Sequence, residues 1–90
     1  MPRYIIERSV PGVHRLNAEG LKNLSKRSNE VLSEMGPHIQ WMESYVMPDK
    51  LCCVYVSESE DLIREHAKRG PFPIDRVTQV TSIIDPTTGE

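Results

Sequence analysis

The sequence lacks the features on which several large classes of protein depend. No apolar run approaches the ~20 residues that a membrane-spanning helix needs, and the opening residues Met1–Ile6 contain no long apolar segment typical of a secretory signal peptide. We therefore expect a cytoplasmic protein with no membrane partner. Neither sign of charge dominates, because 11 basic and 13 acidic residues leave a formal net charge of −2. The basic patch of a nucleic-acid binder is thus not expected.

Cysteine is also scarce, and the two that occur, Cys52 and Cys53, are neighbours. Adjacent cysteines rarely pair, because the ring they would close is strained, so no disulfide framework is expected. Their side chains point to opposite faces of a strand and cannot hold one ion together. The chain also lacks a phosphate-binding loop, the CxxC and HExxH motifs and a nucleophile elbow. No recognised catalytic constellation is visible.

Two helices can be predicted from the spacing of apolar residues. The first spans 18–35, where apolar residues recur at spacings of three, four and seven and Asn17 is suited to cap the N-terminus. The second spans 58–69 and is predicted to open with a capping box formed by Ser57 and Glu60.

Four strands are predicted around these helices, followed by a polar tail. The strands cover residues 3–8, 39–46, 51–56 and 76–84, and the tail covers 85–90. The resulting order is βαββαβ. This order predicts a ferredoxin-like α+β fold, with a four-stranded antiparallel sheet and both helices on one face. A chain of 90 residues then forms a single domain, 1–90.

Both faces of the central hairpin are predicted to be apolar. With regular alternation, one face carries Ile39, Trp41, Tyr45, Val54 and Val56 with Cys52, and the other carries Met42, Val46, Leu51 and Tyr55 with Ser44 and Cys53. The helices can cover only one of them, and the other would expose more apolar area than monomers usually show. We therefore expect a homodimer that packs through the helix-free sheet face, of the dimeric α+β barrel type.

The side chains able to carry chemistry are three histidines and the two cysteines. His66 shares the inward face of the second helix with Leu62 and Ile63, where it could bind a metal ion or transfer a proton. The alternative is a partly buried histidine bonded to a strand or loop group. His14 and His38 lie beside turns, and either could bind a divalent ion at the surface. One cysteine is expected to pack with the helices, and the other to face the dimer side or a pocket.

Several segments together resemble one known family. They are Tyr4–Arg8 with Pro11-Gly12, Trp41–Val46, Asp49-Lys50, Cys53–Tyr55, Arg64–Ala67, Gly70, Val80 and Ile84–Pro86, and the most specific combination is Ser44-Tyr45 with Cys53 and His66. This pattern resembles the small bacterial ferredoxin-like proteins related to a nickel-responsive, nickel-binding protein. The resemblance implies a dimer of ferredoxin-like subunits that holds nickel for sequestration or sensing. The family's Gly-Phe-Pro stands here as Gly70-Pro71-Phe72-Pro73, one residue longer.

The first functional hypothesis is therefore a protein that binds nickel or another divalent transition metal. His66 and Cys53 are its main predicted ligands, and His14 or His38 would supplement them. Imidazole and thiolate are chemically suited to nickel, which stands high in the divalent affinity series.

The second hypothesis is a small cofactor-independent enzyme, an isomerase or an oxygenase, with an apolar pocket near His66. The pocket would be lined by Trp41, Ser44, Tyr45 and Tyr55. His66 would move a proton, and Tyr45 or Tyr55 would orient the substrate. Core packing explains the aromatic residues equally well. A third hypothesis is a binding or regulatory module that acts through the dimer alone.

Overall fold

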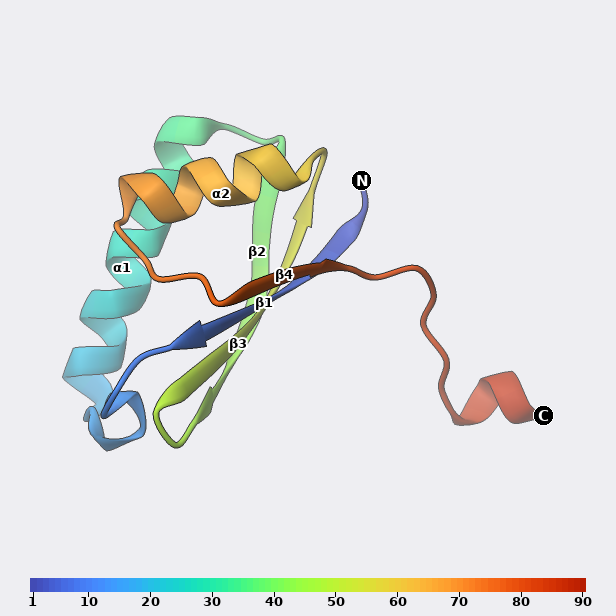
Figure 1. Cartoon of the computed structure of the whole chain (residues 1–90), viewed down its shortest axis with the longest axis horizontal. Coiled ribbons are helices and arrows are strands. Elements are labelled where there is room, and N and C mark those ends of the chain that lie inside the picture. Colours follow the sequence, from blue (N-terminus) through green and yellow to red (C-terminus); the bar gives the residue numbers. More distant parts are fainter.

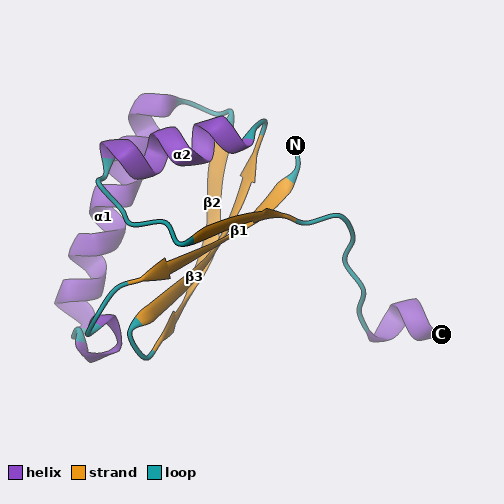
Figure 2. Ribbon diagram, viewed as in Figure 1, coloured by secondary structure: helices purple, strands orange, loops and turns teal.

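Two helices lie on one face of a four-stranded antiparallel sheet in the computed structural model, which describes residues 1–90 (Figures 1 and 2). The elements are β1 (Arg3–Ser9), η1 (Val13–Arg15), α1 (Ala18–Met35), β2 (Ile39–Met47), β3 (Lys50–Ser57), α2 (Glu60–Arg69), β4 (Arg76–Gln79) and η2 (Pro86–Gly89). The strand order β2-β3-β1-β4 places β1 and β3 in the centre of the sheet. This confirms the predicted ferredoxin-like α+β arrangement. Neither helix is long and apolar enough to cross a bilayer.

Helix α1 has the predicted bounds because its two ends carry local stop and start signals. The side chain of Asn17 accepts a hydrogen bond from the backbone N–H of Gly20 at 2.9 Å and caps the first turn. Gly36 ends the helix with a φ of 85°, a left-handed conformation that favours glycine. The inward face of α1 buries Val31 and also Ser28, the one polar residue in its apolar stripe.

Helix α2 begins later than predicted, and its capping residue differs. Ser59 is the N-cap, and its hydroxyl accepts from the backbone N–H of Leu62 at 3.3 Å. Ser57 instead ends β3, is fully buried and donates its hydroxyl to the carbonyl oxygen of Ser59 at 2.8 Å. The predicted capping box of Ser57 and Glu60 is therefore wrong, because Ser57 still belongs to the sheet. Glu60 pairs with Arg64 one turn along the helix at 2.9 Å.

A β-bulge in β2 decides which of its side chains face the helices. Trp41 pairs with Tyr55 of β3. The next pair is Glu43 with Val54, so Met42 is an extra residue without a partner. From this point on, the alternation of side chains along β2 is shifted by one residue.

The bulge corrects the predicted faces of the central hairpin. Ile39 and Trp41 lie on the helix side, where Ile39 joins the core. Tyr45 lies on the helix-free side opposite Cys52 and is exposed. The prediction that Ile39, Trp41 and Tyr45 share one face is wrong because it took the alternation as regular across Met42. The helix-free face therefore carries fewer apolar side chains than predicted.

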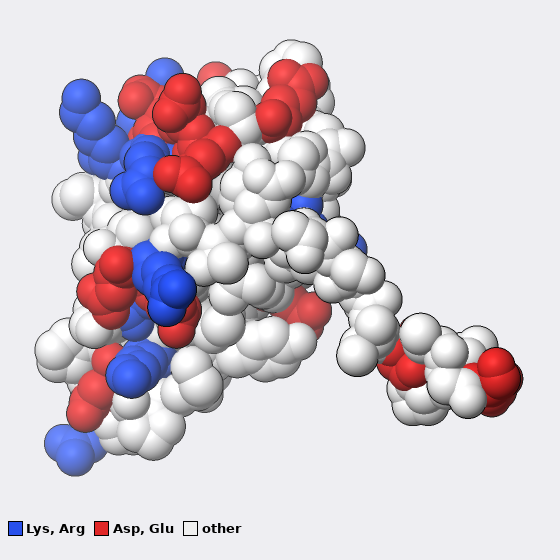
Figure 3. Space-filling view, turned by 45° about the vertical axis from the view of Figure 1, so that its right-hand side comes forward, with Lys and Arg blue, Asp and Glu red and all other residues white.

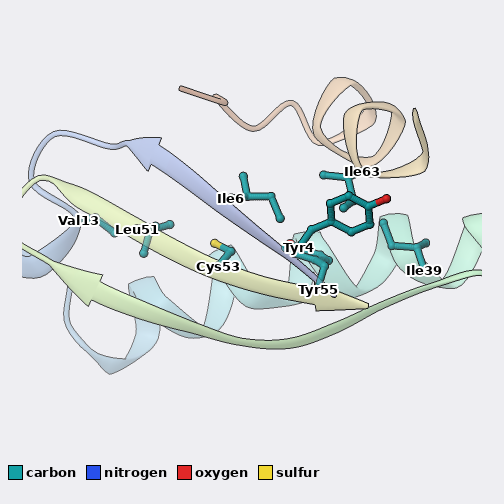
Figure 4. Close-up of a cluster of buried hydrophobic side chains, with 8 residues drawn as sticks. All are labelled: Tyr4, Ile6, Val13, Ile39, Leu51, Cys53, Tyr55 and Ile63. Carbon is teal, nitrogen blue, oxygen red and sulfur yellow. The ribbon is translucent and has the colours of Figure 1, made fainter. Parts of the chain in front are cut away.

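The hydrophobic core fills the space between the centre of the sheet and the helices (Figure 4). Alternate positions of β1 and β3 supply most of it, since these strands are central and their inward side chains meet the helices. Cys53 is the cysteine that packs here, whereas Cys52 faces the other side of the sheet and is half-buried. The core cluster consists of Tyr4, Ile6, Val13, Ile39, Leu51, Cys53, Tyr55 and Ile63.

The residues after β4 leave the body of the molecule as an extended tail (Figure 1). The predicted last strand 76–84 is wrong beyond Gln79, because the neighbouring strand ends there: Val80 already bonds to the carbonyl oxygen of Arg3, the first residue of β1. Ile83 and Ile84 are 66% and 79% exposed. The radius of gyration is 13.9 Å, against about 12 Å for a compact chain of this length.

Replacing the N-cap of α1 should destabilise the fold, whereas the same replacement inside the helix should not. We expect Asn17→Ala to lower the free energy of unfolding by about 1 kcal/mol, since the N–H of Gly20 loses its acceptor. Asn23→Ala, at an exposed position of α1, should raise it by a few tenths of a kcal/mol, because alanine has the higher helix propensity. Urea unfolding of both variants measures the difference, and equal effects would contradict the assigned cap.

Candidate functional site

His66 lies at the centre of the space between the two helices and the sheet. It is fully buried on the inward face of α2. Its Nε2 lies 3.2 Å from the hydroxyl of Ser28 on α1. The polar residues on the inward faces of the two helices therefore contact each other. The ring also contacts two aromatic side chains, with centroids 5.4 Å from Tyr55 and 5.1 Å from Phe72. Its Nδ1 has no hydrogen-bond partner.

The surroundings of His66 hold it in the neutral form. Burial lowers the pKa of His66 to about 4, and the positive charge of Arg8 acts in the same direction, while hydrogen bonding with the backbone of Ser28 opposes them. Burial likewise raises the pKa of Tyr55, with Arg8 opposing. At neutral pH both rings are uncharged. Arg8 is the charged group that acts on both of them.

Arg8 is a buried arginine that the sequence analysis missed. It occupies the inward position of β1 after Tyr4 and Ile6 and is only 4% exposed. Its Nη1 donates to the carbonyl oxygen of Pro73 at 2.7 Å, and its guanidinium carbon lies 5.7 Å from the centroid of the Phe72 ring. Its Nη2 is buried without a partner. The sequence did contain a signal for this. Every second residue of β1 points inward, and Arg8 is the inward position that follows Tyr4 and Ile6.

Beside these residues, a cavity of about 560 Å³ opens between the sheet and α1. Strands β2 and β3 contribute its floor, with Trp41 and Tyr55 among the lining residues. Helix α1 contributes one wall, with Leu24 and Ser28, and the loop 70–73 contributes another. A volume of this size is in the range of small-molecule sites.

The loop 70–73 is held in place by arginine contacts to its backbone. Arg27 of α1 donates to the carbonyl oxygens of Gly70 and Arg69, each at 2.9 Å. The ring of Phe72 lies directly over Gly70, where a Cβ atom would collide with it, so only glycine leaves it room. Phe72 of this loop lies beside both His66 and Arg8.

The four predicted pocket residues do not lie together. Trp41, Ser44 and Tyr55 line the cavity, and the indole N–H of Trp41 donates to the hydroxyl of Ser44 at 2.9 Å. Tyr45 lies on the opposite face of the sheet, because the bulge at Met42 shifts the alternation. His66 does not line the cavity, although its neighbour Tyr55 does. Proton transfer from His66 to a molecule in the cavity therefore stays a prediction.

The four predicted metal ligands occupy three separate places. His66 and Cys53 are buried in the interior, 0% and 3% exposed. His14 lies beside the β2–β3 turn, where its Nδ1 accepts from the backbone N–H of Asp49 at 3.1 Å. His38 lies at the start of β2, at the other end of the strand. No group of three or more histidine, cysteine or acidic side chains is placed to hold an ion.

Two exposed histidines each have a carboxylate beside them. Nδ1 of His38 lies 2.8 Å from Oε1 of Glu58. Nδ1 of His14 lies 3.8 Å from Oδ1 of Asp49. Cys52, the cysteine on the helix-free face, is poorly suited to bind an ion. Burial raises the pKa of its thiol and so disfavours the thiolate.

The stability of the protein should fall with acid through His66. Since its pKa in the folded protein, about 4, lies below the ordinary value of 6.5, the unfolded chain takes up the proton first as the pH falls. The contribution of the neutral His66 to the free energy of unfolding is complete above pH 6.5. Between pH 6.5 and 4 it is lost, which lowers the free energy of unfolding by about 3 kcal/mol in total. Urea unfolding across this range measures it.

Other groups also titrate in this range, so the comparison needs two variants. His66→Phe should show a smaller loss between pH 6.5 and 4 than the wild type, because its side chain cannot be protonated. His38→Gln, at an exposed position, should keep the full loss. A His66→Phe protein with the same pH dependence as the wild type would contradict the assignment.

Comparison with known proteins agrees with this architecture. A solved structure titled "Crystal structure analysis of SCO4226 from Streptomyces coelicolor A3(2)" superposes with a TM-score of 0.73 at 13% identity, over 91% of this chain and 99% of that one. At this identity the likeness shows the fold alone. None of the curated proteins matches by sequence. The family model described as "Nickel responsive protein SCO4226-like" matches residues 4–80, and this protein therefore belongs to the SCO4226-like family of nickel-responsive proteins.

Proposed function

We propose that the protein binds nickel or a similar divalent transition metal, for sequestration or sensing, and that it does so as a homodimer. The description of its family names a response to nickel. The observation in the structure that carries the proposal is the contact of His38 with Glu58, an imidazole and a carboxylate 2.8 Å apart at the surface. Nitrogen and oxygen donors in such a pair suit a divalent transition metal.

The backbone holds this pair in position. His38 directly precedes β2 and Glu58 directly follows β3, and the N–H of Glu58 donates to the carbonyl oxygen of His38 at 3.0 Å. Both side chains are more than half exposed, so an ion could reach them without any opening of the core. Water or donors from a second subunit would complete its coordination.

His14 with Asp49 offers a second, looser pair. The N–H of Gly12 donates to Oδ1 of Asp49 at 2.8 Å and fixes the carboxylate. Because Nδ1 of His14 accepts from the N–H of Asp49, the proton of the neutral ring is on Nε2, so His14 could bind an ion only after Nδ1 is released from this bond.

The interior donors His66 and Cys53 stay in the proposal, but with lower rank. In their favour, Nδ1 of His66 lacks a partner and Cys53 lines the cavity. Both are almost inaccessible, so an ion could reach them only through the cavity or by opening the core. The surface pairs need no such step.

The proposed dimer packs through the helix-free face of the sheet. The centre of this face carries Ile5 and Val56, which are half-buried, with Tyr45 exposed beside them, while Val54 is already buried. The tail adds the exposed Ile83 and Ile84. In Figure 3 charged side chains of both signs gather over the helices, while the surface between them and the tail is mostly uncharged. The exposed Tyr45, Ile83 and Ile84 together with this scarcity of charge favour contact with a second copy.

Titration calorimetry on untagged protein at neutral pH tests metal binding. We expect saturable heat with nickel in the wild type and an affinity lower by about tenfold or more in His38→Gln, because the ion loses its imidazole donor. His14→Gln should remove a weaker phase.

His66→Phe separates the two groups of donors, since it should leave nickel binding unchanged if the surface pairs hold the ion. Loss of binding in His66→Phe, with His38→Gln unaffected, would move the site to the interior. A wild type without saturable heat would overturn the proposal.

Light scattering after gel filtration tests the dimer. We expect twice the 10.3 kDa of one chain for the wild type. Tyr45→Lys, which places a charge on the helix-free face, should give a monomer, whereas Leu16→Lys, at an exposed position before α1, should stay dimeric. A monomeric wild type, or a dimer that Tyr45→Lys leaves intact, would contradict this interface.

A further inference from the structure

Arg8 is a charge without a counter-charge in the interior of the protein. It is 4% exposed, and none of the ion pairs in the structure includes it. Its contacts include the carbonyl oxygen of Pro73, the face of Phe72 and the side chain of Tyr55, and all three are uncharged. An ionised group that is buried without an opposite charge is strongly unfavourable. The position therefore calls for an anion that the chain itself does not supply.

The cavity that Arg8 lines is built to accept such an anion together with an apolar body. No acidic residue lines it, and its only charged lining residues are Arg8 and Arg27. Arg27 is already bonded to Gly70, Arg69 and Glu30. The remaining walls are mainly apolar or aromatic, with Trp41 and Tyr55 on the sheet side. Positive charge at one point and apolar walls elsewhere define an amphipathic ligand.

We propose that this cavity binds a small organic acid with an apolar body, whose carboxylate pairs with Arg8. The bond from Nη1 to Pro73 fixes the guanidinium, and Nη2 has no partner. Because Nη2 is itself buried, the carboxylate pairs with it after the side chains that separate it from the cavity move aside. A neutral ligand would fill the apolar walls but leave the charge unmet, and a cation would be repelled. An inorganic anion would meet the charge but leave the walls empty.

Trp41 supplies an internal probe for the test, because it lines the cavity and is the single tryptophan of the chain. Its fluorescence is followed at pH 7.5 while full-length protein is titrated with decanoate, decanol or decyltrimethylammonium below their micelle concentrations. These three probes share one apolar chain and differ in charge. We expect decanoate to bind saturably, one molecule per chain, and about tenfold or more tighter than decanol, with the cation weakest.

Two arginine variants locate the charge that makes the difference. Arg8→Gln should bind decanoate and decanol alike. Arg3→Gln, on the same strand but on the helix-free face, should keep the preference for the acid. Because Arg8 also holds the loop 70–73, circular dichroism checks that its variant folds, and the probe series on the wild type decides the question if it does not.

Saturable one-to-one binding with preference for the acid supports the proposal. It is overturned if none of the probes binds saturably, if decanol binds the wild type as tightly as decanoate, or if a folded Arg8→Gln variant keeps the preference. Nickel binding at the surface pairs is a separate measurement, and its outcome does not affect this one.

Discussion

One extra residue in β2 sets the arrangement of the whole site. Because Met42 has no partner on β3, Trp41 and Ser44 both face the helices, while Tyr45 turns to the other side of the sheet. Without this bulge, strict alternation would send Trp41 or Ser44 to the helix-free face. The cavity would then lose part of its floor, and the helix-free face would gain apolar area. Bulges often redirect a side chain beside a functional site, and this one does so at the wall of the main cavity.

The inner surface also departs from a purely apolar core in a consistent way. Ser28, His66 and Arg8 are polar residues at inward positions of three different elements, and they lie around the same aromatic side chains. Ser28 and His66 bond to each other. Nδ1 of His66 and Nη2 of Arg8 are left without a hydrogen-bond partner. Buried polar atoms are almost always paired in proteins, and exceptions concentrate where a ligand or a function accounts for them. The exceptions here sit beside the cavity.

Much of the fold could be read from the sequence, because its signals are local. The period of apolar residues and the cap at Asn17 define α1, and the order of elements defines the topology. The errors arise where distant residues decide. Nothing local in β2 predicts the bulge. Ser57 becomes a sheet residue through its place opposite Ile39 and its bond to Pro2, and the last strand stops where β1 begins. The site shares this limit: Ser28 and Arg8 break local apolar patterns, but their meeting beside His66 depends on the packing of α1 and β1 against α2.

The two ends of the chain are attached to the fold very differently. Near the N-terminus, the carbonyl oxygen of Pro2 accepts from the N–H of Ser57, so the first residues are hydrogen-bonded to the sheet. Beyond Val80, the hydrogen bonds of the tail are internal to it. The region matched by the family model also ends at residue 80. The last ten residues thus lie outside the region that the family model matches, and they include Ile84–Pro86, which the resemblance in the sequence had included.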